Sequence, residues 1–123
     1  MGSALAVAAG GAFGSVMRYV ATRLAVEWGS SSTWGTFWVN VTGSLILGLI
    51  VGLSDQRIVL SPAVRSGLTV GVMGGYTTFS TLMLDGTRQL GAGSMLAAAA
   101  NIGGSVAVGL AAMAFGLWLG RSS

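Results

Sequence analysis

Four long windows of apolar residues, separated by short polar connectors, dominate this chain of 123 residues. They cover about residues 3–25, 36–53, 63–84 and 95–119, and each is close to the roughly 20 residues that a helix needs to cross a bilayer. The first window lacks the charged start of a cleavable signal peptide, so we expect it to be retained. The windows predict an all-α membrane protein, residues 1–123, with four transmembrane helices in a single domain.

The few ionisable residues exclude several functional classes. Only 7% of the residues are charged, against about 25% in an ordinary soluble domain. There is no cysteine and no histidine, so the chain lacks thiolate metal ligands and the commonest general base. The net charge of +3 comes from single, scattered arginines, which form no patch for nucleic acid. We expect neither an enzyme nor a nucleic-acid-binding protein.

The arginines divide almost evenly between the two sides of the predicted membrane domain. Four spans place both termini on one side, together with Arg57, Arg65 and Arg121. The opposite side carries Arg23, Arg88 and, about two turns deep in the first window, Arg18. The positive-inside rule then favours neither orientation, so copies inserted in both directions could pair as an antiparallel dimer. The alternative is that one weakly favoured orientation prevails in the cell.

Glycine and hydroxyl residues meet in the third window, in "GVMGGYTTFSTLMLD", residues 71–85. Small residues four apart, such as Gly71 and Gly75, predict close helix packing in lipid. Gly74 and Gly75 should also weaken the helix in mid-membrane. Hydroxyls can bond the backbone groups that such a break leaves free, and they occur at Thr77, Thr78, Ser80 and Thr81. Freed carbonyls suit a small cation and hydroxyl protons suit an anion, so we expect a broken third helix beside a permeation path.

Other polar or aromatic residues within the windows each have two interpretations. Arg18 either snorkels near a helix end or places a positive charge at the mouth of an aqueous vestibule. Asn40 in the second window either bonds across helices or lines a pore. The same two interpretations apply to Asn101 and Ser105, which lie one turn apart in the fourth window. Phe79 either packs or offers the positive edge of its ring to an anion.

The stretch "GGYTTFST", together with the earlier "GTFWVN" and "GAFGSVMRY", resembles the Fluc (CrcB) fluoride channels. The resemblance covers nearly the whole chain. It implies an antiparallel, dual-topology dimer, multi-pass in the plasma membrane of a microbe, that passively exports fluoride from the cytoplasm. It also implies a structural sodium ion at the dimer centre, held by backbone carbonyls at the break. The matching positions are Gly74 and Thr77 of each subunit.

The same resemblance implies a fluoride pathway through this chain. Its pore asparagine and phenylalanine fall on Asn40 and Phe79, and its hydroxyl track, fourth-span serine and vestibule arginine fall on Ser80, Thr81, Ser105 and Arg18. These donors are neutral except for the arginine at the mouth. Such an arrangement fits an anion that must be bound well enough to enter and weakly enough to leave.

The match to the family ends downstream of Thr81. The family usually reads T-T-F-S-T-F-S-x-E, whereas this chain has Leu82, Met83 and Asp85 where the family has its second phenylalanine, the serine and the glutamate. Leucine has no positive ring edge, and a thioether is only a weak acceptor. Three explanations remain open: a homodimer with a modified site, one subunit of a heterodimer whose partner supplies the missing groups, or a different role.

Two other functional classes compete with a fluoride channel. Small multidrug-resistance transporters also have about four spans and dual topology, but they depend on a glutamate within the first span. Here we expect Glu27, Asp55 and Asp85 to lie in connectors or at helix ends. A purely structural membrane subunit would leave the polar stretch after Gly75 unexplained. We therefore rank both classes below the channel.

Overall fold

A computed structural model of the chain describes all of residues 1–123, and every regular element in it is a helix. The elements are α1 (Gly2–Glu27), α2 (Ser32–Gln56), α3 (Pro62–Ser66), the π-helical segment η1 (Gly67–Met73), α4 (Gly74–Tyr76), α5 (Phe79–Gly91) and α6 (Met95–Ser122). The predicted all-α fold is confirmed.

Three of the helices, α1, α2 and α6, are long and apolar enough to cross a membrane. They contain the first, second and fourth predicted windows. The third window holds no continuous helix. The uninterrupted run of α3, η1 and α4 ends at Tyr76, and α5 begins only at Phe79. The predicted interruption of the third window is therefore present.

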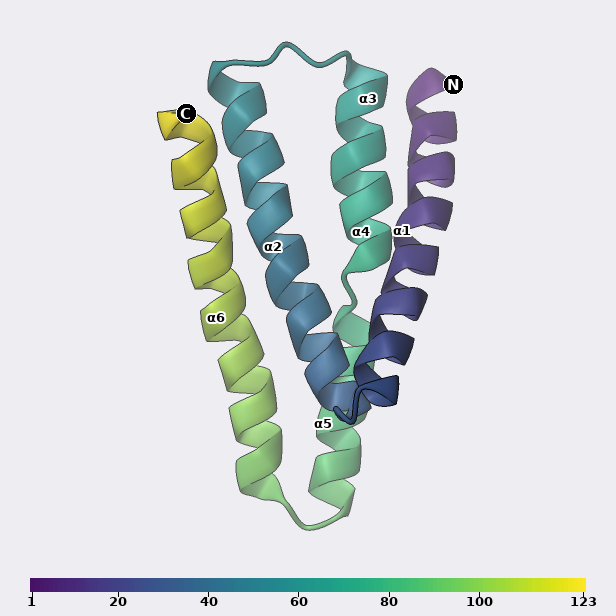
Figure 1. The fold of residues 1–123 in the computed structure, drawn as a ribbon, viewed down its shortest axis with the longest axis vertical. Coiled ribbons are helices and arrows are strands. Elements are labelled where there is room, and N and C mark those ends of the chain that lie inside the picture. Colours follow the sequence, from purple (N-terminus) through teal and green to yellow (C-terminus); the bar gives the residue numbers. More distant parts are fainter.

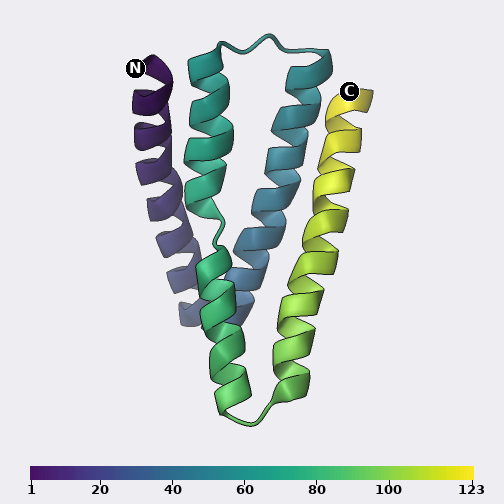
Figure 2. The same ribbon diagram turned by 180° about the vertical axis from the view of Figure 1, so that it is seen from behind.

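The helices form two pairs, and the two members of each pair run in the same direction while the pairs run opposite to each other (Figures 1 and 2). Helix α2 packs along the length of α6, and α1 packs against the segment made of α3, η1 and α4. Both termini and the connector between α2 and α3 lie at one end of the molecule, as predicted from four windows. Below the break, α5 runs to the opposite end beside α6.

Glycine allows the backbones of these helices to touch. A Cβ atom added at Gly52 of α2 would lie 2.6 Å from the carbonyl oxygen of Leu117, and one added at Gly75 of α4 would lie 2.6 Å from that of Gly11. No real side chain fits at such distances. The predicted role of small residues in close helix packing is confirmed at these positions, which hold α2 to α6 and α4 to α1.

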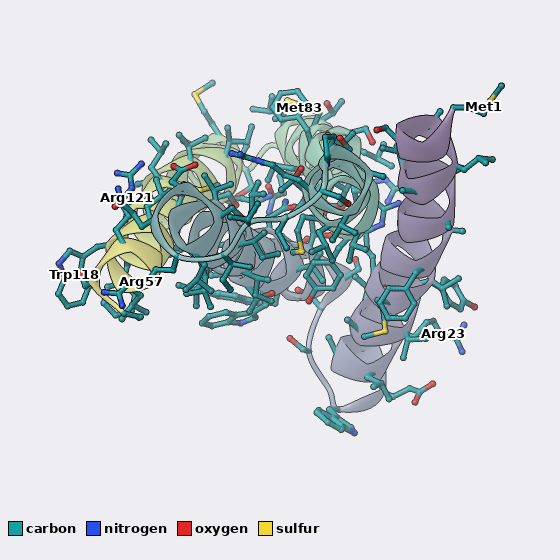
Figure 3. The ribbon with its side chains drawn as sticks, turned by 90° about the horizontal axis from the view of Figure 1, so that it is seen from above. Met1, Arg23, Arg57, Met83, Trp118 and Arg121 are labelled. Atoms are coloured by element: carbon teal, nitrogen blue, oxygen red, sulfur yellow. The ribbon has the colours of Figure 1, made fainter.

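The exterior of the single chain is apolar. Only 19 of 123 residues are buried, and large apolar side chains are exposed on every long helix. Seen from above, α1 lies at one edge of the bundle, with Arg23 pointing away from it, and Trp118 projects from α6 at the opposite edge (Figure 3). A bundle that is apolar all round is suited to lipid or to a second subunit.

Candidate functional site

The helix break lies at Thr77 and Thr78, three residues after the glycine pair Gly74 and Gly75. Both threonines are extended, with φ and ψ of −82° and 159° for Thr77 and −150° and 114° for Thr78. Gly74 is helical, at −64° and −36°. The glycines themselves are therefore helical, and Gly75 provides the close contact with α1.

The side-chain amide of Asn40, on α2, bonds to the backbone at the break. Its Nδ2 donates to the carbonyl oxygen of Thr78 at 3.0 Å, and its Oδ1 accepts from the N–H of Thr78 at 2.7 Å. One side-chain amide thus replaces both helical hydrogen bonds of one residue. Asn40 has the interhelical role that its first interpretation describes, and one amide N–H remains for a ligand.

Threonine hydroxyls satisfy the helix ends on both sides of the break, as predicted. The hydroxyl of Thr77 donates to the carbonyl oxygen of Met73 at 2.9 Å. The hydroxyl of Thr78 accepts from the N–H of Thr81 at 3.2 Å and donates to its Oγ1 at 3.0 Å. Thr78 is therefore the N-cap of α5, a contact that typically contributes about 1 kcal/mol to helix stability.

Arg18 connects α1 to the same break. Its Nη1 donates to the carbonyl oxygen of Thr77 at 3.0 Å. The guanidinium therefore faces the break and does not extend toward the end of α1. A guanidinium has five N–H donors, so others remain for water or an anion.

Carbonyl oxygens at the break differ in whether they have partners. The end of α4 removes the helical donors of the carbonyls of Gly74, Gly75 and Tyr76, since the N–H of Thr78 is bonded to Asn40. No side chain replaces these donors. Unpaired carbonyl oxygens are the hard ligands that a small cation prefers. The carbonyl predicted as a ligand at Gly74 is free, and the one at Thr77 already accepts from Arg18.

Two cavities flank the break. The first, which we call the α6-side cavity, has a volume of about 250 Å³ and is lined by Asn40, Ser44, Leu47, Thr77, Thr78, Phe79, Leu82, Ser105 and Val106. It brings together three residues of the predicted pathway from three helices. The hydroxyl oxygen of Ser105 is buried there and has no hydrogen-bond partner. A buried hydroxyl without a partner is available to a bound ion or water.

The second cavity, the α1-side cavity, has a volume of about 280 Å³ and is lined by Ser15, Arg18, Tyr19, Thr22, Ser32, Thr36, Thr78 and Thr81. Seven of these eight residues carry a hydroxyl and the eighth is the arginine. The lining is therefore rich in hydrogen-bond donors for an anion. Thr78 lines both cavities, so the break forms the wall between them.

Residues around the start of α5 occupy different environments. Phe79 is 72% exposed in the single chain, whereas Leu82 is 5% exposed and forms part of the α6-side cavity. Ser80 lines neither cavity, and its hydroxyl lies 3.4 Å from that of Thr78. Met83 lies on the outside of the bundle (Figure 3).

Asn101 does not share the α6-side cavity with Ser105. Its Nδ2 donates to Oε1 of Gln89 at 3.3 Å and so links α6 to α5. Asn101 and Gln89 line a third cavity of about 360 Å³, whose other walls include Trp34 and Phe37. The interhelical interpretation of Asn101 describes this contact.

Two polar residues near the break were missed or misplaced by sequence reasoning. Thr36 is 3% exposed and lines the α1-side cavity; its position four residues before Asn40, on the same face of α2, was the available signal. Asp85 is 6% exposed within α5, and its Oδ2 has no partner. Its expected place at a helix end is wrong, because α5 continues to Gly91. The argument that all three acids lie in connectors or at helix ends therefore fails for Asp85.

Comparison with known proteins relates nearly the whole chain to one family. The family model described as CrcB-like protein, Camphor Resistance (CrcB), matches residues 5–117. The chain is 47% identical over 118 residues to the fluoride-specific ion channel FluC of Nitrobacter winogradskyi, an alignment that covers 95% of this chain and 94% of that protein. It is 42% identical over 118 residues to the FluC protein of Maridesulfovibrio salexigens, with the same coverage. It is 41% identical over 123 residues to that of Rhizobium meliloti, covering 99% and 98% of the two chains.

Proposed function

Because the chain belongs to the CrcB family, whose relatives described above are named as fluoride-specific ion channels and not as enzymes, we propose that it conducts fluoride passively out of a microbial cytoplasm. The observation that carries the proposal is the partnerless, buried hydroxyl of Ser105, in one cavity with Asn40 and Phe79. The efflux measurement at the end of the Discussion tests it.

The mechanism follows from the hydration of the ion. Fluoride is small and binds water tightly, so a pore must replace its hydration shell with donors and still release it. The α6-side cavity offers the hydroxyl of Ser105 and the remaining amide proton of Asn40. The α1-side cavity offers the hydroxyl of Thr81 and the guanidinium of Arg18. Only Arg18 is charged, and we place the vestibule in the α1-side cavity that it lines, so that it attracts anions without adding a charge to the α6-side cavity.

The functional unit that we propose is an antiparallel dimer of chains with four spans each, inserted in both orientations in the plasma membrane. The apolar exterior, the nearly even arginine distribution and the exposure of Phe79 support this assembly. In the dimer, the ring of Phe79 would border the pathway together with the second subunit. Ser80, which lines neither cavity of the single chain, would also face the pathway there.

The proposed dimer contains a structural sodium ion at its centre. Gly74 and Thr77 of each subunit would hold it through their carbonyl oxygens. These ligands fit a small cation because the carbonyl oxygen of Gly74 accepts no hydrogen bond. When bound, the ion supplies a positive charge that neutralises the carbonyl dipoles exposed at the two breaks.

A heterodimer is the second candidate, and Leu82 is the observation that favours it. This buried side chain forms cavity wall but has no ring edge to present to an anion. A homologous partner with a second phenylalanine would supply that edge. We place the homodimer with a modified site first. An exporter of the small multidrug-resistance type is the weaker alternative, because the family match extends over nearly the whole chain.

Replacing Phe79 by isoleucine should lower fluoride efflux at least about tenfold, because isoleucine fills a similar space without a positive edge. Phe115→Ile is the matched control. That ring is 53% exposed on α6 and stacks on Trp118, away from both cavities. Efflux from reconstituted liposomes, followed with a fluoride electrode, compares the two variants. Equal rates for Phe79→Ile and the unmodified protein would show that the ring plays no part in conduction.

A further inference from the structure

Arg18 and the proposed sodium ion are two cations directed at one oxygen atom. We propose that the guanidinium of Arg18 competes with sodium for the carbonyl oxygen of Thr77 and thereby sets the sodium affinity of the break. The inference rests on the sodium site of the proposed function and adds a residue on α1 that controls it.

The first step is the contact itself. The carbonyl of Thr77 follows the last residue of α4 and accepts from Nη1 of Arg18 at 3.0 Å; it accepts no other hydrogen bond. Nothing else donates a side-chain hydrogen bond from α1 to the break. Arg18 is therefore the resident cation of this carbonyl in the single chain.

The second step concerns the charge of Arg18, which no carboxylate balances. Arg23, Arg65 and Arg121 form ion pairs with Glu27 or Asp55, whereas Arg18 forms none. The other residues of the α1-side cavity carry neutral hydroxyls. No neighbouring negative charge therefore reduces the electrostatic effect of Arg18 on the carbonyl of Thr77 or on an ion bound there.

The third step is the repulsion between the two cations. A carbonyl oxygen has two lone pairs, so it can accept from both, but two positive charges on one oxygen repel strongly in a partly buried site. Sodium must bind against this repulsion or displace the guanidinium. The α1-side cavity, which Arg18 already lines, gives the displaced side chain a polar place to move to. Sodium occupancy and the position of Arg18 are thus coupled.

Replacing Arg18 by glutamine tests the competition, since glutamine keeps an amide donor and removes the charge. We would measure the thermal unfolding midpoint of detergent-solubilised protein against sodium concentration, with N-methylglucamine holding the ionic strength constant. The half-saturating sodium concentration should fall about tenfold or more. Arg23→Gln is the matched control, because Arg23 is 63% exposed on the same helix and paired with Glu27; its half-saturating concentration should not change.

Arg18→Lys keeps the charge and should stay within about threefold of the unmodified protein, which a merely structural role of the guanidinium would not predict. An unchanged or higher half-saturating concentration in Arg18→Gln would overturn the inference and leave the sodium site standing. The absence of any sodium effect in the unmodified protein and in Arg18→Gln would overturn both.

A second measurement uses the unmodified protein and does not depend on the folding of a variant. Phenylglyoxal modifies free guanidinium groups, and mass spectrometry of peptides follows the rate at each arginine. Saturating sodium should accelerate modification of Arg18 several-fold and leave Arg23 unchanged. Equal rates at Arg18 with and without sodium would contradict the competition.

Discussion

Asn40→Asp should reduce fluoride efflux at least about 100-fold. The carboxylate can still accept from the N–H of Thr78, but it cannot donate to the carbonyl of Thr78, which Nδ2 of Asn40 now satisfies. It also places a negative charge in the α6-side cavity. An anion passing about 4 Å from that charge meets a repulsion of about 4 kcal/mol at an effective dielectric constant near 20, which corresponds to nearly 1000-fold in rate.

The matched control for Asn40→Asp is Thr42→Val on the same helix. The hydroxyl of Thr42 bonds to its own helix and to the hydroxyl of Tyr76 at 3.1 Å, and it lines neither cavity at the break. Its loss should change efflux less than about threefold. Both variants are compared in liposomes at equal protein content. Efflux from Asn40→Asp within tenfold of the unmodified protein would remove Asn40 from the pathway.

Gly75→Ala should destabilise the fold and abolish most of the flux. The new Cβ would lie 2.6 Å from the carbonyl oxygen of Gly11 and 3.1 Å from the backbone nitrogen of Ser15. Both are backbone atoms of α1, so no side-chain rotation relieves the contact. Helix α1 must move away from α4, which also separates Arg18 from Thr77. We expect a loss of at least about 1–3 kcal/mol in stability, as for overpacked cores, and a fall in efflux of more than about tenfold.

Gly103→Ala on α6 is the control for the glycine change. Apart from the nearby backbone of its own helix, no atom lies within 4 Å of the position where its Cβ would stand. Alanine is also a better helix former than glycine by up to about 1 kcal/mol. This variant should be at least as stable as the unmodified protein. Thermal unfolding in detergent compares the two alanine variants. Equal stability would show that the backbones of α1 and α4 leave room for a Cβ atom at position 75, contrary to the distances given above.

Composition and hydropathy predict most of the fold, because lipid requires long apolar helices with internal hydrogen bonds. The position of the break was less accessible. It depends on an amide 38 residues away, since Asn40 takes both backbone partners of Thr78. A local pattern such as Gly74–Gly75 carries no information on that contact, so it indicates a weak helix without locating the extended residues.

The extent of α5 shows a second limit of sequence reasoning. A hydropathy window ends where a charged residue appears, but helical hydrogen bonding continues through Asp85 to Gly91, and this segment packs against α6. The same limit applies to the candidate site. The types of its residues were predictable, whereas their division between two cavities that share Thr78 depends on the packing of α1, α2 and α6 around the break.

Fluoride efflux from liposomes that contain only this chain tests the central claim most directly. A potassium gradient with valinomycin sets the voltage, and a fluoride electrode follows the release. We predict fluoride release from the chain alone. Release only after a homologous subunit is added would contradict the homodimer and support the heterodimer. No fluoride release in either case, or flux of guanidinium-like cations driven by a pH gradient, would contradict a fluoride channel altogether.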